Sequence, residues 1–165
     1  MKIHRGLALA CFCMAPLLAA PSLGFAETDA AGFERVTPDQ IVWKDVPNGR
    51  GVQFAAISGD PSKPGIYVIR AKFPPGIMSS PHFHDEDRFV VVVKGTWYTG
   101  TDADWDPAKT VGLPTGSFMR HPAKAVHFDG AKDEEVIVQI IGIGPSKTTP
   151  LVPAEGDFGK PHKLK

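Results

Sequence analysis

The chain has 165 residues and a formal net charge of zero, with 18 basic and 18 acidic side chains. This length is enough for one hydrophobic core, and the balanced charge argues against a nucleic-acid partner. With 17 glycines and 16 prolines, the composition favours short strands joined by turns over long helices.

The first 26 residues have the pattern of a secretory signal peptide. Lys2 and Arg5 precede an apolar segment, residues 6–20, and Gly24-Phe25-Ala26 places small residues at a cleavage site. The apolar segment is shorter than the roughly 20 residues of a membrane-spanning helix, so we expect no membrane partner after cleavage. The sequence therefore predicts a periplasmic or secreted protein.

Cleavage removes both cysteines of the chain, Cys11 and Cys13. The mature chain from Glu27 then has no thiol, so its core must be stabilised by packing without disulfides. Loss of Lys2 and Arg5 leaves 16 basic and 18 acidic residues, a net charge of −2.

The mature chain consists of short apolar segments separated by glycine and proline. We predict strands at residues 41–43, 52–57, 66–73, 89–93, 96–99, 117–119, 126–128 and 135–143. The β-branched segment 89–93 reads as a strand buried on both faces. Strands at this spacing, without a long amphipathic helix, indicate an all-β sandwich or barrel in one domain, residues 27–144. From residue 145 to 165 the chain is rich in proline and lysine, and we expect a loose C-terminal tail.

The stretch from residue 75 to 95 carries the most specific chemical signal. His82 and His84 are two residues apart, so on a strand both imidazoles leave the same face. Two such rings can converge on one metal ion at about 2.0–2.1 Å per nitrogen. His127 is the best candidate for a third ligand.

The spacing of these residues resembles the two motifs of the cupin superfamily. The first motif is glycine, five residues, His-x-His, three or four residues, glutamate, six residues and glycine. The chain matches every spacing with Gly76, His82, His84, Arg88 and Gly95, but Arg88 stands where the motif has glutamate.

The second motif is glycine, five residues, Pro-x-Gly, two residues, histidine, three residues and asparagine. Gly116, Pro122 and His127 fit it, with Lys124 in place of the second glycine and Ala131 in place of asparagine. The resemblance implies a jelly-roll barrel with His82, His84 and His127 as ligands of a divalent transition metal.

Arg88 is the main departure from the family pattern. A guanidinium about 5 Å from a divalent ion would repel it by roughly 6–7 kcal/mol at an effective dielectric of about 20. Arg88 could turn aside to Asp85, Asp87 or Asp129, with Asp129 on the same strand face as His127. It could instead hold an anionic substrate beside the metal, or the metal could be lost and the pocket kept for binding. Glu86 could replace the glutamate only if the strand continued past His84, whereas the acidic run reads as a turn.

The resemblance also implies a reaction class, because some three-histidine cupins are oxygenases that hold Fe(II). We therefore expect a dioxygenase-like enzyme acting on a small molecule, with Arg88 as the anchor if that molecule is anionic. Fe(II) is favoured by this analogy, and Mn, Zn, Ni or Cu would also accept imidazole. A non-catalytic binding or sensing cupin and a metal-dependent lyase or isomerase are the alternatives. Cupins often pair through their sheets, so a homodimer is a further expectation. His121 is expected at the rim of the barrel.

Overall fold

A computed structural model describes residues 28–155 and 162–163 of the chain. The predicted signal peptide, residues 1–26, lies outside this part. Within the described residues, no helix is long and apolar enough to cross a membrane.

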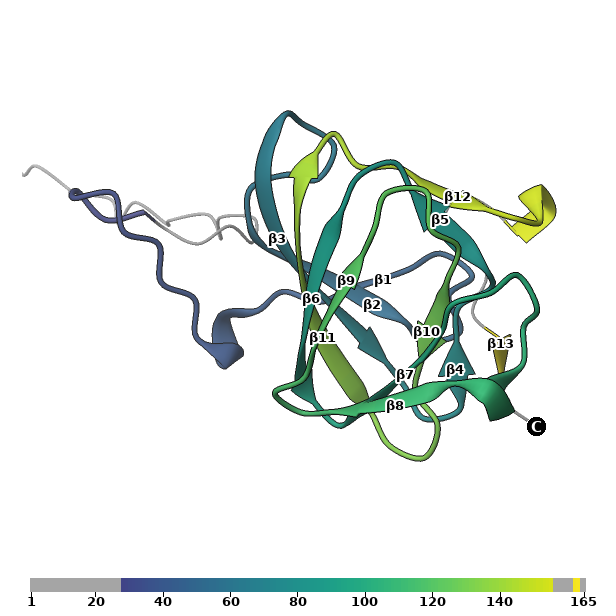
Figure 1. The fold of residues 1–165 in the computed structure, drawn as a ribbon. Coiled ribbons are helices and arrows are strands. Elements are labelled where there is room, and N and C mark those ends of the chain that lie inside the picture. The colour runs from purple at the N-terminus through teal and green to yellow at the C-terminus, as the bar shows by residue number, and fades with distance from the viewer. Residues whose placement is uncertain (1–27, 156–161, 164–165) are drawn as a thin grey trace, which may run out of the picture.

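Two antiparallel sheets face each other and curl into a jelly-roll barrel (Figure 1). The larger sheet has six strands in the order β1-β2-β3-β11-β6-β9. Its members are β1 (Lys44–Asp45), β2 (Gln53–Ser58), β3 (Gly65–Phe73), β11 (Val136–Gly144), β6 (Arg88–Lys94) and β9 (Phe118–His121). The all-β prediction is confirmed, because the described helical turns are only short 3₁₀ segments: η1 (Pro38–Gln40), η2 (Pro107–Lys109) and η3 (Pro153–Glu155).

The second sheet has five strands in the order β13-β4-β10-β7-β8. They are β13 (His162–Lys163), β4 (Ile77–Met78), β10 (Phe128–Gly130), β7 (Thr96–Gly100) and β8 (Val111–Pro114). A separate pair, β5 (His82–His84) and β12 (Thr148–Pro150), lies along one end of the barrel (Figure 1). β5 carries the His-x-His motif, so the motif lies at the mouth of the barrel.

The core lies between the two large sheets and is built from alternate residues of their strands. β11 contributes Val136, Val138 and Ile140, while the residues between them are half-buried. This alternation is what a sheet with one buried face requires. The other main members are Val52, Tyr67, Ala71, Phe73, Ile77, Val90, Val92, Trp97 and Ala131.

β6 is buried on one face only, which corrects the prediction for residues 89–93. Val90 and Val92 are in the core, whereas Phe89, Val91 and Val93 are 42%, 36% and 37% exposed. The β-branched residues in segment 89–93 favour a strand, but this preference does not require that both faces of the strand be buried. Phe118 of β9 is also exposed and stacks on Phe89 with 6.5 Å between ring centroids, so the outer face of this sheet is apolar.

The segment after Pro145 is not a loose tail in its described part. Thr148, Thr149 and Pro150 pair with His84, Phe83 and His82 across β12 and β5. The proline- and lysine-rich composition concealed a strand because only three residues pair. Residues 148–150 are thus the strand partner of the segment that carries both motif histidines.

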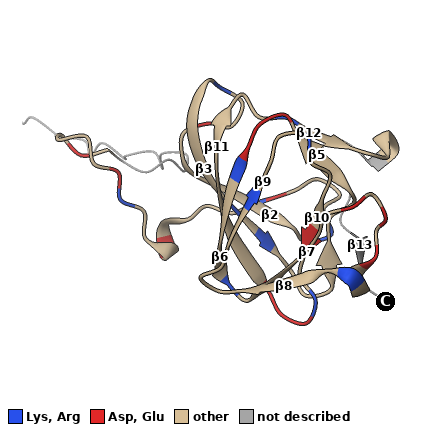
Figure 2. Ribbon diagram, viewed as in Figure 1, with Lys and Arg blue, Asp and Glu red and all other residues tan. Residues whose placement is uncertain are grey.

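Charged residues of both signs are interspersed over the strands and loops of the described chain (Figure 2). Acidic residues are visible in the loops between β5 and β6, between β7 and β8 and before β11, and basic residues also lie on the strands. Several are locally paired, including Arg120 with Asp87 and Lys94 with Glu135.

The first and last residues of the first motif are both glycines, and they offer a matched test of the turn geometry. Gly76 and Gly95 both have φ of +76°, which costs other residues about 1–2 kcal/mol. A Cβ on Gly95 would lie 2.5 Å from the carbonyl oxygen of Glu135, whereas none of the described atoms outside the adjoining residues lies within 4 Å of one on Gly76.

We expect Gly76→Ala to lower the free energy of unfolding by about 1 kcal/mol. Gly95→Ala should cost about 1–3 kcal/mol more, because the turn must also shift. Urea unfolding followed by circular dichroism measures both, and equal losses in the two variants would contradict the clash at Gly95.

Candidate metal centre

The three predicted ligand histidines converge inside the mouth of the barrel. His82 and His84 come from β5, and His127 lies just before β10. The ring centroids are 4.4 Å apart for His82 and His127, 4.9 Å for His82 and His84, and 5.0 Å for His84 and His127. One nitrogen of each ring lies within 4.8 Å of the others. Ligands at about 2.1 Å from one ion are at most about 4.2 Å apart, so small shifts suffice for coordination.

A backbone bridge brings the two motifs together. The amide of His82 donates to the carbonyl of His127 at 2.9 Å, and the amide of His127 donates back to His82 at 2.9 Å. This reciprocal pair places the two side chains directly opposite each other. His82 and His127, 45 positions apart in the sequence, thus become neighbours at the site.

Neighbouring oxygens orient each ring so that Nε2 faces inward. Nδ1 of His82 donates to the carbonyl of Ser80 at 2.8 Å, and Nδ1 of His127 donates to that of Ala125 at 3.0 Å. Nδ1 of His84 lies 3.2 Å from the hydroxyl of Thr148. A hydrogen bond from Nδ1 leaves the Nε2 lone pair for a ligand, as is usual for metal-binding histidines. Nε2 of His127 is buried and has no partner among the described residues.

His121 belongs to the same cluster, which corrects its expected place at the rim. It ends β9, is 5% exposed, and its ring centroid lies 3.8 Å from that of His127. The strand alternation carried a signal for this position, since Met119, two residues earlier on the same face, packs against the core.

Asp129 lies on β10, two residues after His127, and points to the same side as predicted. Its Oδ1 accepts a hydrogen bond from the indole of Trp97 at 3.2 Å, and its Oδ2 is 3.9 Å from Nε2 of His127. Its carboxylate forms a second possible metal group with His121 and His127.

Arg88 points into the cluster instead of turning aside to Asp85, Asp87 or Asp129. Its Nη1 donates to Nε2 of His84 at 3.1 Å, its Nε donates to Glu86 at 3.1 Å, and its Nη2 donates to the hydroxyl of Ser146. The side chain is almost fully buried. Glu86, which sequence analysis treats as part of a turn, is thus the ion-pair partner that places the guanidinium, and Tyr67 also donates to Glu86 at 3.2 Å.

The remaining acidic residues of this turn bind elsewhere. Asp85 pairs with Lys124, and Asp87 accepts from Arg120 and from the amide of Ala123. Lys124 has φ of +65°, the left-handed conformation that the glycine of the second motif adopts readily. The side chain of Lys124 pairs with Asp85, and its backbone amide donates a hydrogen bond to the carbonyl of His84 at 2.8 Å. These two contacts stabilise the left-handed conformation although the residue is not glycine.

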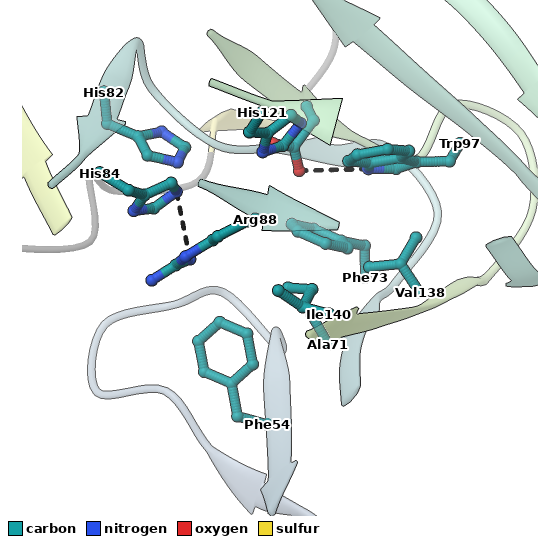
Figure 3. A pocket seen from close by; sticks show the side chains of 11 residues that line it. Phe54, Ala71, Phe73, His82, His84, Arg88, Trp97, His121, Val138 and Ile140 are labelled. Atoms are coloured by element: carbon teal, nitrogen blue, oxygen red, sulfur yellow. Dashed lines mark hydrogen bonds between the residues drawn. The ribbon is translucent and has the colours of Figure 1, made fainter. Parts of the chain in front are cut away.

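The pocket has a polar end and an apolar end (Figure 3). In Figure 3 the histidines and Arg88 lie together, and Phe54, Ile140 and Ala71 close the opposite side. The full lining is Phe54, Ala71, Phe73, His82, His84, Arg88, Trp97, His121, Asp129, Val138 and Ile140. A polar cluster against apolar walls is the usual form of a small-molecule site.

Burial keeps the histidines neutral near pH 7. Burial, reinforced by neighbouring positive charge, lowers the pKa of His82 to about 3 and that of His121 to about 2. Burial lowers the pKa of His127 to about 4, and burial followed by the charge of Arg88 lowers that of His84. Neutral imidazole is the form that binds metal. Burial raises the pKa of Asp129 to about 7, opposed by the hydrogen bond from Trp97.

Comparison with known families identifies the fold family. A family profile described as a domain of unknown function, DUF4437, matches residues 34–159. The chain belongs to this cupin-like family. A comparison with curated proteins gives no match.

Solved structures of cupins share this fold at low sequence identity. The polyketide cyclase RemF from Streptomyces resistomycificus matches with a TM-score of 0.61 at 14% identity, over 72% of this chain and 85% of that one. An RmlC-like cupin from Ralstonia eutropha gives 0.54 at 18%, over 77% and 76%. KdgF from Halomonas sp. gives 0.51 at 18%, over 66% and 91%. At these identities the similarity establishes the cupin fold and not an activity.

The four buried histidines predict a steep loss of stability in acid for the metal-free protein. An unfolded histidine takes up a proton near pH 6.5, whereas the folded ones resist until about pH 4 or below. Their contribution is therefore complete above pH 6.5 and is lost as the pH falls, by up to about 1.4 kcal/mol per pH unit for each. Asp129 acts in the opposite direction over this range, since its pKa is raised and the folded state keeps its proton below about pH 7.

We expect the free energy of unfolding, measured with urea in the presence of a chelator, to fall by several kcal/mol from pH 7 to pH 5. His121→Asn should make the free energy of unfolding less dependent on pH, because it removes the contribution of one buried histidine, up to about 1.4 kcal/mol per pH unit. A stability that does not change over this range would contradict the burial of neutral imidazoles.

Proposed function

We propose that this protein is an exported metal-binding cupin that acts as an oxygenase-like enzyme on a small molecule with an anionic group. The carrying observation is the convergence of three imidazoles, with the buried Nε2 of His127 lacking a partner among the described residues. A buried polar atom without a partner costs about 1–3 kcal/mol unless a ligand occupies it. The basic and apolar start of the sequence supports export to the periplasm or beyond.

The donor set is compatible with a divalent transition metal. His82, His84 and His127 would hold it, and their Nδ1 hydrogen bonds would maintain their orientation. Fe(II), favoured by resemblance to three-histidine cupins, would supply oxygen chemistry when bound, and Mn, Zn, Ni or Cu would also accept imidazole.

Arg88 is proposed as the anchor for the anionic group of the substrate. Its guanidinium reaches the pocket from β6 and is held by Glu86 and Ser146. A carboxylate could form two parallel hydrogen bonds with it, which would draw Nη1 away from His84 and release Nε2 of that ring. The apolar walls made by Phe54, Phe73 and Ile140 would exclude water from the bound molecule.

Two other functions use the same pocket. The bond between Arg88 and His84 favours a non-catalytic binding or sensing cupin, because it satisfies His84 without a metal. A metal-dependent lyase or isomerase, which needs no oxygen, is the alternative among enzymes, because the same three histidines would hold its metal. Pairing of two copies belongs to the same proposal, supported by the exposed apolar residues Phe89 and Phe118 on the outer sheet face.

His127→Ala should strongly weaken metal binding, because His127 contributes the buried Nε2 that has no partner among the described residues. We expect wild-type protein, stripped with chelator and titrated with Zn²⁺ or Fe(II) under anaerobic conditions, to bind one ion per chain by calorimetry and elemental analysis. The His127→Ala variant should bind at least about 100-fold more weakly, since it loses a direct ligand. Wild-type protein that binds no divalent ion would refute the enzyme proposal and leave the metal-free binding function.

Arg88→Glu should tighten metal binding. The change removes the guanidinium from Nε2 of His84 and introduces the carboxylate of the usual cupin motif. Removing a repulsion of roughly 6–7 kcal/mol allows a gain of at least about tenfold in affinity.

Arg120→Glu makes the same charge change at an exposed position of β9 and serves as control. Arg88→Gln should give a smaller gain if Arg88→Glu folds poorly beside Glu86. A weaker affinity in folded Arg88 variants would mean that the guanidinium supports the site.

A further inference from the structure

Two adjacent buried imidazoles each have a nitrogen without a hydrogen-bond partner among the described residues. Among the described residues, the buried side-chain atoms lacking a hydrogen-bond partner are Glu86 Oε2, His121 Nε2 and His127 Nε2. The rings of His121 and His127 have centroids 3.8 Å apart and are 5% and 3% exposed. Leaving both nitrogens desolvated and unpaired is costly, so the arrangement points to a ligand that both would bind.

Asp129 supplies an oxygen for the same ligand. Its Oδ1 is held by the indole of Trp97, and its backbone amide donates to the hydroxyl of Ser79 at 3.0 Å. Oδ2 is then directed toward Nε2 of His127 at 3.9 Å, too long for a hydrogen bond. Two ligand atoms at about 2.1 Å from one ion can be up to about 4.2 Å apart, so a shared metal fits this gap.

The charge balance favours this group over the three-histidine group while Arg88 lies at His84. Nε2 of His84 is already bonded to a guanidinium, and that positive charge opposes a cation beside it. The group of His121, His127 and Asp129 includes a carboxylate that neutralises part of the ion's charge. It also needs no movement of Arg88 away from Glu86 and Ser146.

We propose that the pocket has a second metal position, formed by His121, His127 and Asp129, which holds a divalent ion while Arg88 is bonded to His84. This second position rests on the proposed metal binding by the pocket, but it places the ion between His121, His127 and Asp129 instead of between the three motif histidines. Two histidines and one carboxylate suit Fe(II), Zn²⁺ or Co²⁺. Both positions need Nε2 of His127, which has one lone pair, so only one position is occupied at a time.

The test compares Zn²⁺ and Co²⁺ affinity across single variants of the full mature chain. Wild-type protein should bind one ion, and both His121→Ala and Asp129→Asn should weaken it by at least about 100-fold, beyond the roughly 10–100-fold typical of outer partners. His84→Ala should change affinity by less than about tenfold and should leave the visible absorption of bound Co²⁺ unchanged. His121→Asn repeats the test if His121→Ala does not fold.

Trp97→Phe is the matched control for Asp129→Asn. It removes the hydrogen bond to Oδ1 but keeps the carboxylate, so metal binding should persist. Binding that is lost in His84→Ala but kept in His121→Ala and Asp129→Asn overturns the second position and leaves the three-histidine site. A wild-type protein that binds neither ion overturns this inference and the proposed metal function together.

Discussion

The reciprocal backbone pair between His82 and His127 is the contact on which the site depends. It joins β5 to the segment before β10, so two motifs far apart in sequence place their imidazoles on one point. Backbone hydrogen bonds of this kind set register, and a slip of one residue would turn the rings of the motif to the opposite face. The positions of the histidine rings therefore depend first on this strand pairing.

The segment after Pro145 does more for the pocket than its composition suggests. Thr148 lies against Nδ1 of His84, and Ser146 accepts a hydrogen bond from Arg88. Pairing of β12 with β5 brings Thr148 to His84, and Ser146, two residues before β12, contacts Arg88.

Arg88 gives this cupin an electrostatic character different from that implied by the usual glutamate. The guanidinium and the partly buried Glu86 form an ion pair, and removing such a pair from water is costly unless its hydrogen bonds are satisfied. Arg88 meets this condition through Glu86, Ser146 and His84, whereas one oxygen of Glu86 has no described partner. The carboxyl group beside His127 belongs instead to Asp129 on β10, and burial raises its pKa to about 7.

Local pattern was enough to predict the strand-rich fold and the three converging histidines. Strands 66–73 and 135–143 were predicted within one residue of β3 and β11, because long alternating or β-branched segments between turn residues have few other solutions. The spacing of glycines and histidines carried the family resemblance. The predictions that segment 89–93 is buried on both faces and that the chain after residue 145 is loose were wrong. Exposure of alternate residues and pairing of a three-residue strand depend on which strands pack beside them.

By itself the sequence determined that His82 and His84 share a face and that a third histidine follows at motif spacing, because these are properties of strand period and local spacing. Only the tertiary structure decided that His121 is buried beside His127 and that Glu86 holds Arg88 in the pocket. Each of these depends on which strands become neighbours and on the burial that follows. Burial then determines which polar atoms must find a partner, and no spacing within one segment contains that information.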